Sequence, residues 1–192
     1  MVGNQAKSTG GGISATSGKV GIVNSTLTRN TAGKNGGAIA SHGSKGSLTL
    51  IHCTISGNQL DGAGISMGGG GVYGYHSMIY ATNCIIAGNT SGTGPGPDLW
   101  CRAQLIAAAG SLIGNGTDSA VNHGVNGNLT GLDALLAPLG DHGGPTPTMP
   151  PLSGSPAIDA AARTSLATDQ RGLPRIVGAA PDIGAVEYRG DK

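Results

Sequence analysis

The sequence is poor in aromatic and charged side chains, and this scarcity excludes several classes of protein. It contains no Phe and a single Trp, and only 11% of its 192 residues are charged, against about 25% in an average soluble domain. The formal net charge of +1 argues against a nucleic-acid partner, because such proteins usually carry a basic face. No apolar run approaches the ~20 residues of a membrane-spanning helix, so we expect no membrane span.

A secretory signal peptide is also lacking, because no apolar segment follows Lys7. Repeat-like sequence is already present at Gly10, and we therefore expect the chain to be a fragment of a longer protein. The three cysteines are odd in number, so they cannot all pair as disulfides. The five histidines show no spacing typical of metal ligands, and we expect them in solvated loops.

Glycine is abundant instead, with 37 residues, and much of it belongs to an internal repeat. A first motif places an isoleucine after a pair or triplet of small residues, at Ile13, Ile39 and Ile65, which are 26 residues apart. A variant, Gly69–Tyr73, follows closely. A constant period of this length is typical of repeat architectures.

A second motif interleaves with the first and ends in asparagine. Its apolar members are Leu27, Ile55 and Ile86, and its closing residues are Asn30, Asn58 and Asn89. Short alternating runs lie between the two motifs, so each unit of 26 to 31 residues holds three strand signals separated by turn residues.

This period fits one coil of a parallel β-helix, because solenoid repeats span ~20–45 residues and each repeat pairs with its neighbours. We predict an all-β, right-handed parallel β-helix over residues 1–129. The isoleucines of the first motif would form one inward ladder and the apolar residues of the second another, while the asparagines would stack at a corner. The alternative is an antiparallel sandwich or barrel with a strand every 8–12 residues.

The composition changes after about residue 95. Nine of the ten acidic residues follow this point, and most prolines lie between Pro138 and Pro181. We expect residues 130–192 to form an irregular segment that caps the open end of the stack, because solenoids need terminal caps and an exposed strand edge invites pairing with other chains.

Four motifs in this segment occur in an order typical of one family. They are LGDHGGPTPT from Leu139, GSPAID from Gly154, TDQRG from Thr168 and PDIGAVE from Pro181. Over residues 130–188 the chain resembles the C-terminal signature of the bacterial "choice-of-anchor Q" proteins, with His142 where that family usually has Asn. The resemblance implies a right-handed β-helix and a secreted or cell-surface setting, and it implies no assigned activity.

Polysaccharide cleavage is the leading enzymatic hypothesis, because many pectin-degrading enzymes are β-helices. Glycoside hydrolysis uses two carboxylates, whereas the coils up to residue 95 offer only Asp61. Glycan binding is a separate hypothesis. It rests on one aromatic cluster whose rings can stack on sugars or pack at a coil corner, namely Tyr73, Tyr75, His76 and Tyr80.

Four aspartates in the C-terminal segment are candidate ligands for Ca²⁺, which prefers oxygen donors. They are Asp141, Asp159, Asp169 and Asp182. The competing interpretation is that each caps a turn through its own side chain, and Asp169 can in addition clamp Arg171. No other cofactor is expected.

Cys53 and Cys84 occupy the same repeat position. They can be small inward side chains or a disulfide, although in-register neighbouring strands orient a disulfide poorly.

Three further motifs have simpler structural explanations. Gly64–Gly68 matches a nucleophile elbow and Gly69–Gly74 matches a dinucleotide fingerprint, but neither has the strand and helix that those sites require. A threonine ladder of the kind that could bind ice stops after Thr26 and Thr54, because the next coil has Ile85.

The sequence therefore predicts a non-enzymatic structural or adhesive module of an extracellular or cell-surface assembly. Its partners would be copies of itself, joined head to tail, or cell-surface glycans. The alternative is a polysaccharide-binding or polysaccharide-degrading, pectinase-like β-helix, a hypothesis that rests on fold analogy.

Overall fold

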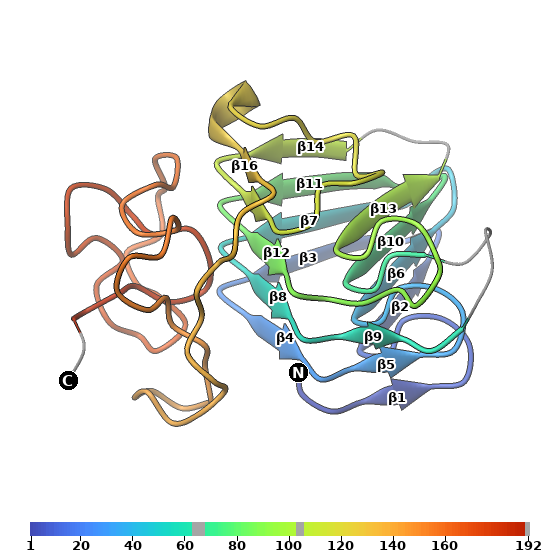
Figure 1. Cartoon of the computed structure of the whole chain (residues 1–192), viewed down its shortest axis with the longest axis horizontal. Coiled ribbons are helices and arrows are strands. Elements are labelled where there is room, and N and C mark those ends of the chain that lie inside the picture. Colours follow the sequence, from blue (N-terminus) through green and yellow to red (C-terminus); the bar gives the residue numbers. More distant parts are fainter. Residues whose placement is uncertain (63–67, 103–105, 191–192) are drawn as a thin grey trace.

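The computed structural model describes residues 1–62, 68–102 and 106–190, and short parallel strands stacked in four sheets make up most of its regular structure (Figure 1). Sheet I contains β2 (Ile13–Thr16), β6 (Ile39–His42), β10 (Val72–Tyr75) and β13 (Leu99–Arg102). Sheet II contains β3 (Lys19–Val23), β7 (Ser47–Ile51), β11 (Met78–Thr82) and β14 (Ile106–Ala109).

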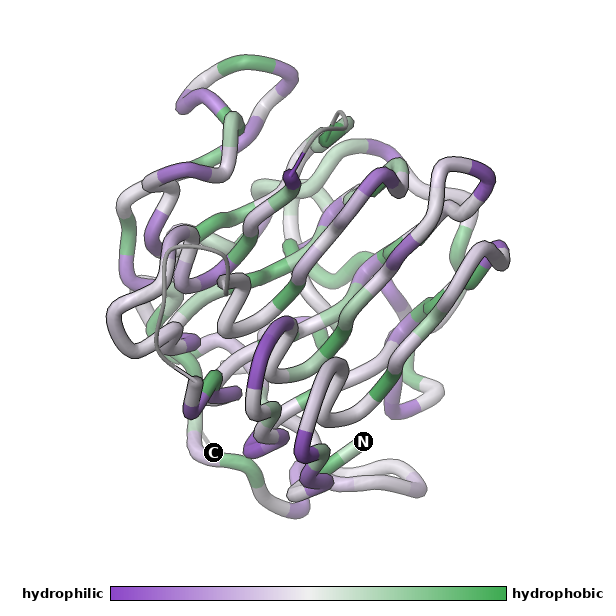
Figure 2. Tube along the Cα trace, turned by 90° about the vertical axis from the view of Figure 1, so that its right-hand side faces the viewer, coloured by the Kyte–Doolittle hydropathy of each residue, from purple (hydrophilic) through white to green (hydrophobic). Residues whose placement is uncertain are grey.

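Sheet III contains β4 (Thr26–Thr28), β8 (Thr54–Ser56), β12 (Ile85–Ala87), β15 (Leu112–Ile113) and β16 (Leu129–Thr130). Sheet IV is shorter, with β1 (Gln5–Ala6), β5 (Thr31–Ala32) and β9 (Gln59–Leu60). Because each strand pairs with its counterpart one repeat away, the chain winds through the sheets in turn and forms about four coils. Figure 2 shows these coils as parallel rungs.

The parallel β-helix predicted from the repeat is confirmed, and the antiparallel sandwich is wrong. Every pairing between named strands in the described part of the chain is parallel. No described helix is long and apolar enough to cross a membrane.

The core lies inside the coils and is filled by ladders of apolar side chains from sheets I, II and III, two of them from sheet II. In sheet III, Leu27 pairs with Ile55 and Ile55 with Ile86, as the second motif predicts, and all three are fully buried. Burying such a side chain contributes roughly 1.5–3 kcal/mol, so the ladders supply much of the hydrophobic stabilisation.

The predicted ladder of sheet I needs a correction at its third member. Ile13 pairs with Ile39, but the residue next to Ile39 is Val72, whereas Ile65 lies outside the described residues. Two glycine-rich motifs compete for this position, and spacing to the following strand decides between them. Val72 precedes the inward Ile79 by seven residues, as Ile13 precedes Val20.

Glycine is required where the chain enters sheet I. Gly36 has a φ of +64°, and a Cβ at this position would overlap the carbonyl oxygen of Ile39. The neighbouring coils repeat the arrangement at Gly10 and Gly69, so the turn is tight in successive coils.

The sequence analysis expected the C-terminal segment at an end of the stack. In the structure this segment packs beside sheet III (Figure 1, orange and red). Its contacts are distributed over three coils. Asn24 donates to the carbonyl oxygen of Thr168 at 2.8 Å, Thr54 Oγ1 accepts from the amide of Ala185 at 3.0 Å, and Asn83 Nδ2 donates to the carbonyl oxygen of Ala162 at 2.8 Å.

The outward residues of sheet III explain this position. They change from threonine in the first two coils to Ile85 and Leu112 in the next two. These apolar side chains are buried in a second cluster with Ala157 and Ile183 from the C-terminal segment. Sheet III is therefore apolar on both faces in its later coils, and the segment removes its outer face from water.

The C-terminal end of the stack is covered by residues 114–128, which include a 3-10 turn, η1 (Val125–Gly127). Val121 from this loop belongs to the main core cluster. Asn128 holds the loop against β14, because its Nδ2 donates to the carbonyl oxygen of Ala108 at 2.8 Å. Residues 114–128 thus cover this end of the stack, and the C-terminal segment packs against its side.

Candidate functional site

A ladder of asparagines runs along the corner between sheets III and IV, as the second motif predicts. Asn30 Nδ2 donates to Asn58 Oδ1 at 2.9 Å, and Asn58 Nδ2 donates to Asn89 Oδ1 at 2.8 Å. Each Oδ1 also accepts the backbone N–H of the preceding asparagine, at 3.0 Å in both cases. These side chains are buried, so the ladder satisfies polar groups that would otherwise be costly inside the protein.

The ladder has a direction and two different ends. At one end Asp98, which the sequence analysis missed, accepts from Asn89 N and Nδ2, both at 2.8 Å, and its other oxygen accepts from Asn115 N at 2.6 Å. Burial raises the pKa of the Asp98 carboxyl. Both oxygens of Asp98 accept from amides, and an aspartate has no side-chain N–H to donate onwards, so Asp98 terminates the series.

The other end of the ladder is the exposed Asn4, which donates to Asn30 Oδ1 at 2.9 Å. It lies at the N-terminal edge of the stack, where β1, β2 and β3 each pair on one side only among the described strands. Ile13, Val20 and Ile22 are only partly buried there. The N-terminal edge therefore exposes strand hydrogen-bonding groups, an amide oxygen and apolar surface together.

The four predicted glycan-contact residues are divided between two sheets and a corner. Tyr73 and Tyr75 lie on the outer face of sheet I, and His76 follows them at the turn. Tyr80 is 41% exposed on sheet II. Tyr75 and His76 are in edge contact, with ring centroids 4.3 Å apart.

Three residues that the sequence analysis did not place in this cluster share the outer face of sheet I. Trp100 pairs with Tyr73, and His42 and Arg102 both pair with Tyr75. Ring centroids are 5.4 Å apart between His42 and Tyr73 and 5.5 Å apart between Tyr73 and Trp100. Aligning the coils on Val72 would have revealed this relationship, because it puts these residues in equivalent positions.

The predicted calcium ligands act as turn and backbone acceptors. Asp141 accepts from the amide of Gly143 at 3.0 Å, Asp159 from that of Ala180 at 3.0 Å, and Asp182 from that of Asp159 at 2.8 Å. Asp169 binds Arg171 through Nε at 3.0 Å and NH2 at 2.7 Å. In the part of the chain that is described, no group of three or more His, Cys, Asp and Glu side chains is arranged to hold a metal ion.

A buried ion pair organises the core of the C-terminal segment. Arg175 donates to Glu187 Oε1 at 3.0 Å and to Asn24 Oδ1, in the first coil, at 2.6 Å. Burial, with a smaller effect of the Asp182 charge, raises the pKa of Glu187 to about 7. His52, expected in a solvated loop, is buried between coil and segment, and burial lowers its pKa to about 4.

Cys53 and Cys84 are buried side by side and form no disulfide. The amide of Cys53 donates to Cys84 Sγ at 3.5 Å. A side-chain hydrogen bond with Cys84 lowers the pKa of the Cys53 thiol, whereas burial raises the pKa of the Cys84 thiol.

Gly64–Gly68, which matches a nucleophile elbow in sequence, lies almost wholly outside the described residues.

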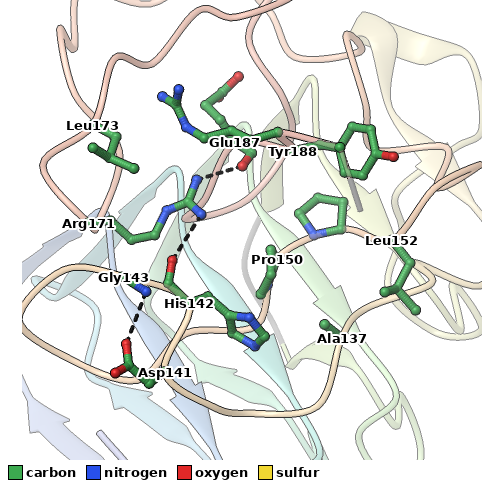
Figure 3. Close-up of a pocket in the computed structure, with 13 residues that line it drawn as sticks. Ala137, Asp141, His142, Gly143, Pro150, Leu152, Arg171, Leu173, Glu187 and Tyr188 are labelled. Atoms are coloured by element: carbon green, nitrogen blue, oxygen red, sulfur yellow. Dashed lines mark hydrogen bonds between the residues drawn. The ribbon is translucent and has the colours of Figure 1, made fainter. Parts of the chain in front are cut away.

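A cavity of about 770 Å³ lies within the C-terminal segment (Figure 3). Pro150, Leu152 and Tyr188 provide its apolar wall, and His142 lies below them. Arg171 enters from the opposite side but is already bound, with NH2 donating to the carbonyl oxygen of Glu187 at 2.6 Å. The Arg171 guanidinium, which also donates to the carbonyl oxygen of His142, thus joins two loops of the segment.

Comparisons with protein-family models, with curated proteins and with solved structures found no match to this chain. The fold defines it as a β-solenoid protein, and its two ends and outer faces are the features from which a function can be inferred.

Proposed function

We propose that this chain is a non-enzymatic structural module of an extracellular or cell-surface assembly, and that it joins further β-coils at its N-terminal edge. The observation that carries the proposal is the difference between the two ends of the stack. The C-terminal end is covered by residues 114–128, and its asparagine ladder stops at Asp98. The N-terminal edge is open at β1, β2 and β3, whereas residues 1–3 pair with β4 there. The ladder ends at this edge in an unburied acceptor, Asn4.

The ladder specifies what the N-terminal edge accepts. Inside the stack, each asparagine Oδ1 receives a backbone N–H and a side-chain amide from the coil before it. A coil that joins at the edge would therefore present an asparagine to Asn4 and parallel strands to β1, β2 and β3.

This pattern favours a different contact from the head-to-tail association between copies that the sequence suggested. In that contact the acceptor Asn4 would meet the acceptor Asp98, and residues 114–128 would stand between the two stacks. Two facing acceptors cannot form a hydrogen bond. We accordingly place the joining coil on another part of an assembly.

A non-enzymatic role is supported by how the acidic groups are used. Asp61 accepts from Gln59 at 2.6 Å, and the buried carboxylates of Asp98, Asp169, Asp182 and Glu187 all accept from backbone amides. The extracellular setting rests on the resemblance of residues 130–188 to the choice-of-anchor Q proteins.

The proposal is tested by adding one coil to the N-terminal edge through a change in the sequence. Residues 30–57 are copied and placed directly before Asn4, in place of residues 1–3, so that the copied Asn30 precedes Asn4 as it naturally precedes Asn58. We expect the added coil to fold, with slow amide exchange in β2 and β3 and one cooperative unfolding transition at a higher temperature. A matched chain carries the same added residues in shuffled order.

Rapid exchange throughout the added coil, together with an unfolding temperature equal to that of the shuffled chain, would contradict the proposal. The result would show that the edge does not template a coil even when one is covalently supplied.

A further inference from the structure

We propose that the outer face of sheet I, with the corner leading to sheet II, binds an extended anionic polysaccharide running along the stack axis. The site goes beyond the proposed structural function, because it lies on the side of the stack and does not use the N-terminal edge.

The first element of the site is a column of rings that crosses successive coils. His42 comes from β6, Tyr73 from β10 and Trp100 from β13, with neighbouring centroids 5.4 and 5.5 Å apart. Tyr75 lies beside the column, 6.4 Å from His42. The column follows the stack axis, because the strands that carry its rings are neighbours in sheet I.

These rings lie outside the core. Tyr73 is buried beneath its neighbours, with 4% of its surface exposed, whereas Tyr75 is 38% exposed and Trp100 is partly exposed. Their inward neighbours Val72 and Leu99 already fill the coil interior. Tyr75 and Trp100, which keep exposed surface, therefore provide faces on which the apolar faces of sugar rings can stack.

The spacing of the rings suits a polymer. Neighbouring strands are about 4.8 Å apart, and the ring separations are only slightly larger. This repeat is close to the rise of one sugar unit in an extended polysaccharide. A chain lying along the axis would thus meet one coil with each sugar.

The second element is positive charge at the corner between sheets I and II. Lys19, Lys45 and Arg102 are exposed there and come from three different coils. The turns of Lys19 and Lys45 are neighbours, because the amide of Ser47 donates to Gly18 O at 3.1 Å. The turn at His76 lies between those of Lys45 and Arg102, since the amide of Gly43 donates to Tyr75 O at 2.9 Å and that of His76 to Arg102 O at 3.2 Å.

The described strands that build this surface, from β2 and β3 to β13, contain no Asp or Glu. Residues 1–95 contain a single acid, Asp61, which follows sheet IV and is bonded to Gln59. A row of cations beside an aromatic column is complementary to a polymer with one carboxylate per sugar, such as a polyuronate, and less so to a neutral glucan.

The test compares binding of three polymers by isothermal titration calorimetry: polygalacturonate, neutral dextran and single-stranded oligothymidylate. We expect polygalacturonate to bind, dextran to bind at least tenfold more weakly, and the oligonucleotide to bind no better than dextran. Polygalacturonate affinity should also fall several-fold between 50 and 300 mM salt, because salt screens exposed charges.

Matched variants locate the site. Tyr75→Ala and Arg102→Gln should each weaken polygalacturonate binding at least fivefold, since both side chains are exposed. Tyr80→Ala, which changes a tyrosine of similar exposure on sheet II, and Arg29→Gln, at the corner between sheets III and IV, should leave it unchanged. Absence of polygalacturonate binding, equal binding of dextran or oligothymidylate, or equal losses in the matched controls would overturn the proposal.

Discussion

The asparagine ladder should make a large contribution to stability, and the substitution Asn58→Ala tests how large it is. Asn58 is buried and occupies the middle of the ladder. Its Oδ1 accepts from Asn30 N and Nδ2, while its Nδ2 donates to Leu27 O at 3.0 Å and to Asn89 Oδ1 at 2.8 Å. Alanine removes these four interactions and a fifth from Nδ2 to Ser56 O at 3.3 Å, and it leaves their buried partners in place.

The expected loss of stability follows from the buried groups that lose a hydrogen-bond partner. A buried donor or acceptor left without a partner costs about 1–3 kcal/mol. Asn30 Nδ2 keeps a second contact, to Met1 O at 3.2 Å, and Asn89 Oδ1 keeps the amide of Asn58. Asn30 N loses its side-chain acceptor, and Leu27 O loses its bond from Asn58 Nδ2. We therefore expect Asn58→Ala to lower the free energy of unfolding by about 3–5 kcal/mol.

Asn4→Ala is the matched control. Asn4 donates to Asn30 Oδ1 from its backbone N at 3.0 Å and from Nδ2 at 2.9 Å. Alanine keeps the backbone bond, and water can replace the other because Asn4 is exposed. The loss there should be below about 1 kcal/mol, the usual net worth of a hydrogen bond. Urea unfolding followed by circular dichroism measures both values, and similar losses in the two variants would refute the reasoning.

The other predictions concern a coil turn and the buried ion pair. Gly36→Ala should lower the free energy of unfolding by well over the ~1–2 kcal/mol of left-handed strain alone, because its Cβ would overlap the Ile39 carbonyl oxygen. Gly124→Ala, with φ +76° and nothing near its Cβ, should cost only that strain. Equal unfolding temperatures for the two variants would contradict this expectation. Glu187 has a folded-state pKa of about 7, above its ordinary 4.5, so the wild type loses stability as pH rises through this interval. Glu187→Gln removes this pH dependence. In urea unfolding, the free energy of unfolding of the variant minus that of the wild type should rise by about 3 kcal/mol between pH 4.5 and 8. A difference that does not change with pH would contradict the raised pKa of Glu187.

The sequence predicts the coils well because a β-helix is nearly one-dimensional. Each strand contacts the strand one period away, so the spacing of Leu27, Ile55 and Ile86 is enough to place them side by side. The error at Ile65 has a local cause. Two glycine-rich motifs lie within one period there, and only the spacing to the following strand distinguishes them.

The position of the C-terminal segment is harder to predict, because it depends on a surface that several coils build together. Ile85 followed by Ile86 is the available signal. Two adjacent apolar residues in a strand point to opposite faces, so one of them needs a cover outside the coil. The aromatic column is similar, since Tyr73 and Trp100 are distant in sequence and meet only when the coils are aligned on Val72.

We propose that the N-terminal edge of the stack templates a further coil at β1, β2 and β3, while residues 114–128 close the C-terminal end. Hydrogen exchange measured by mass spectrometry on the original and coil-extended chains tests it most directly. In the original chain, the β2 and β3 amides that face the edge should exchange quickly and those of β7 and β11 slowly. In the extended chain, protection should spread to β2, β3 and the added coil, whereas unchanged exchange in β2 and β3 would contradict the account.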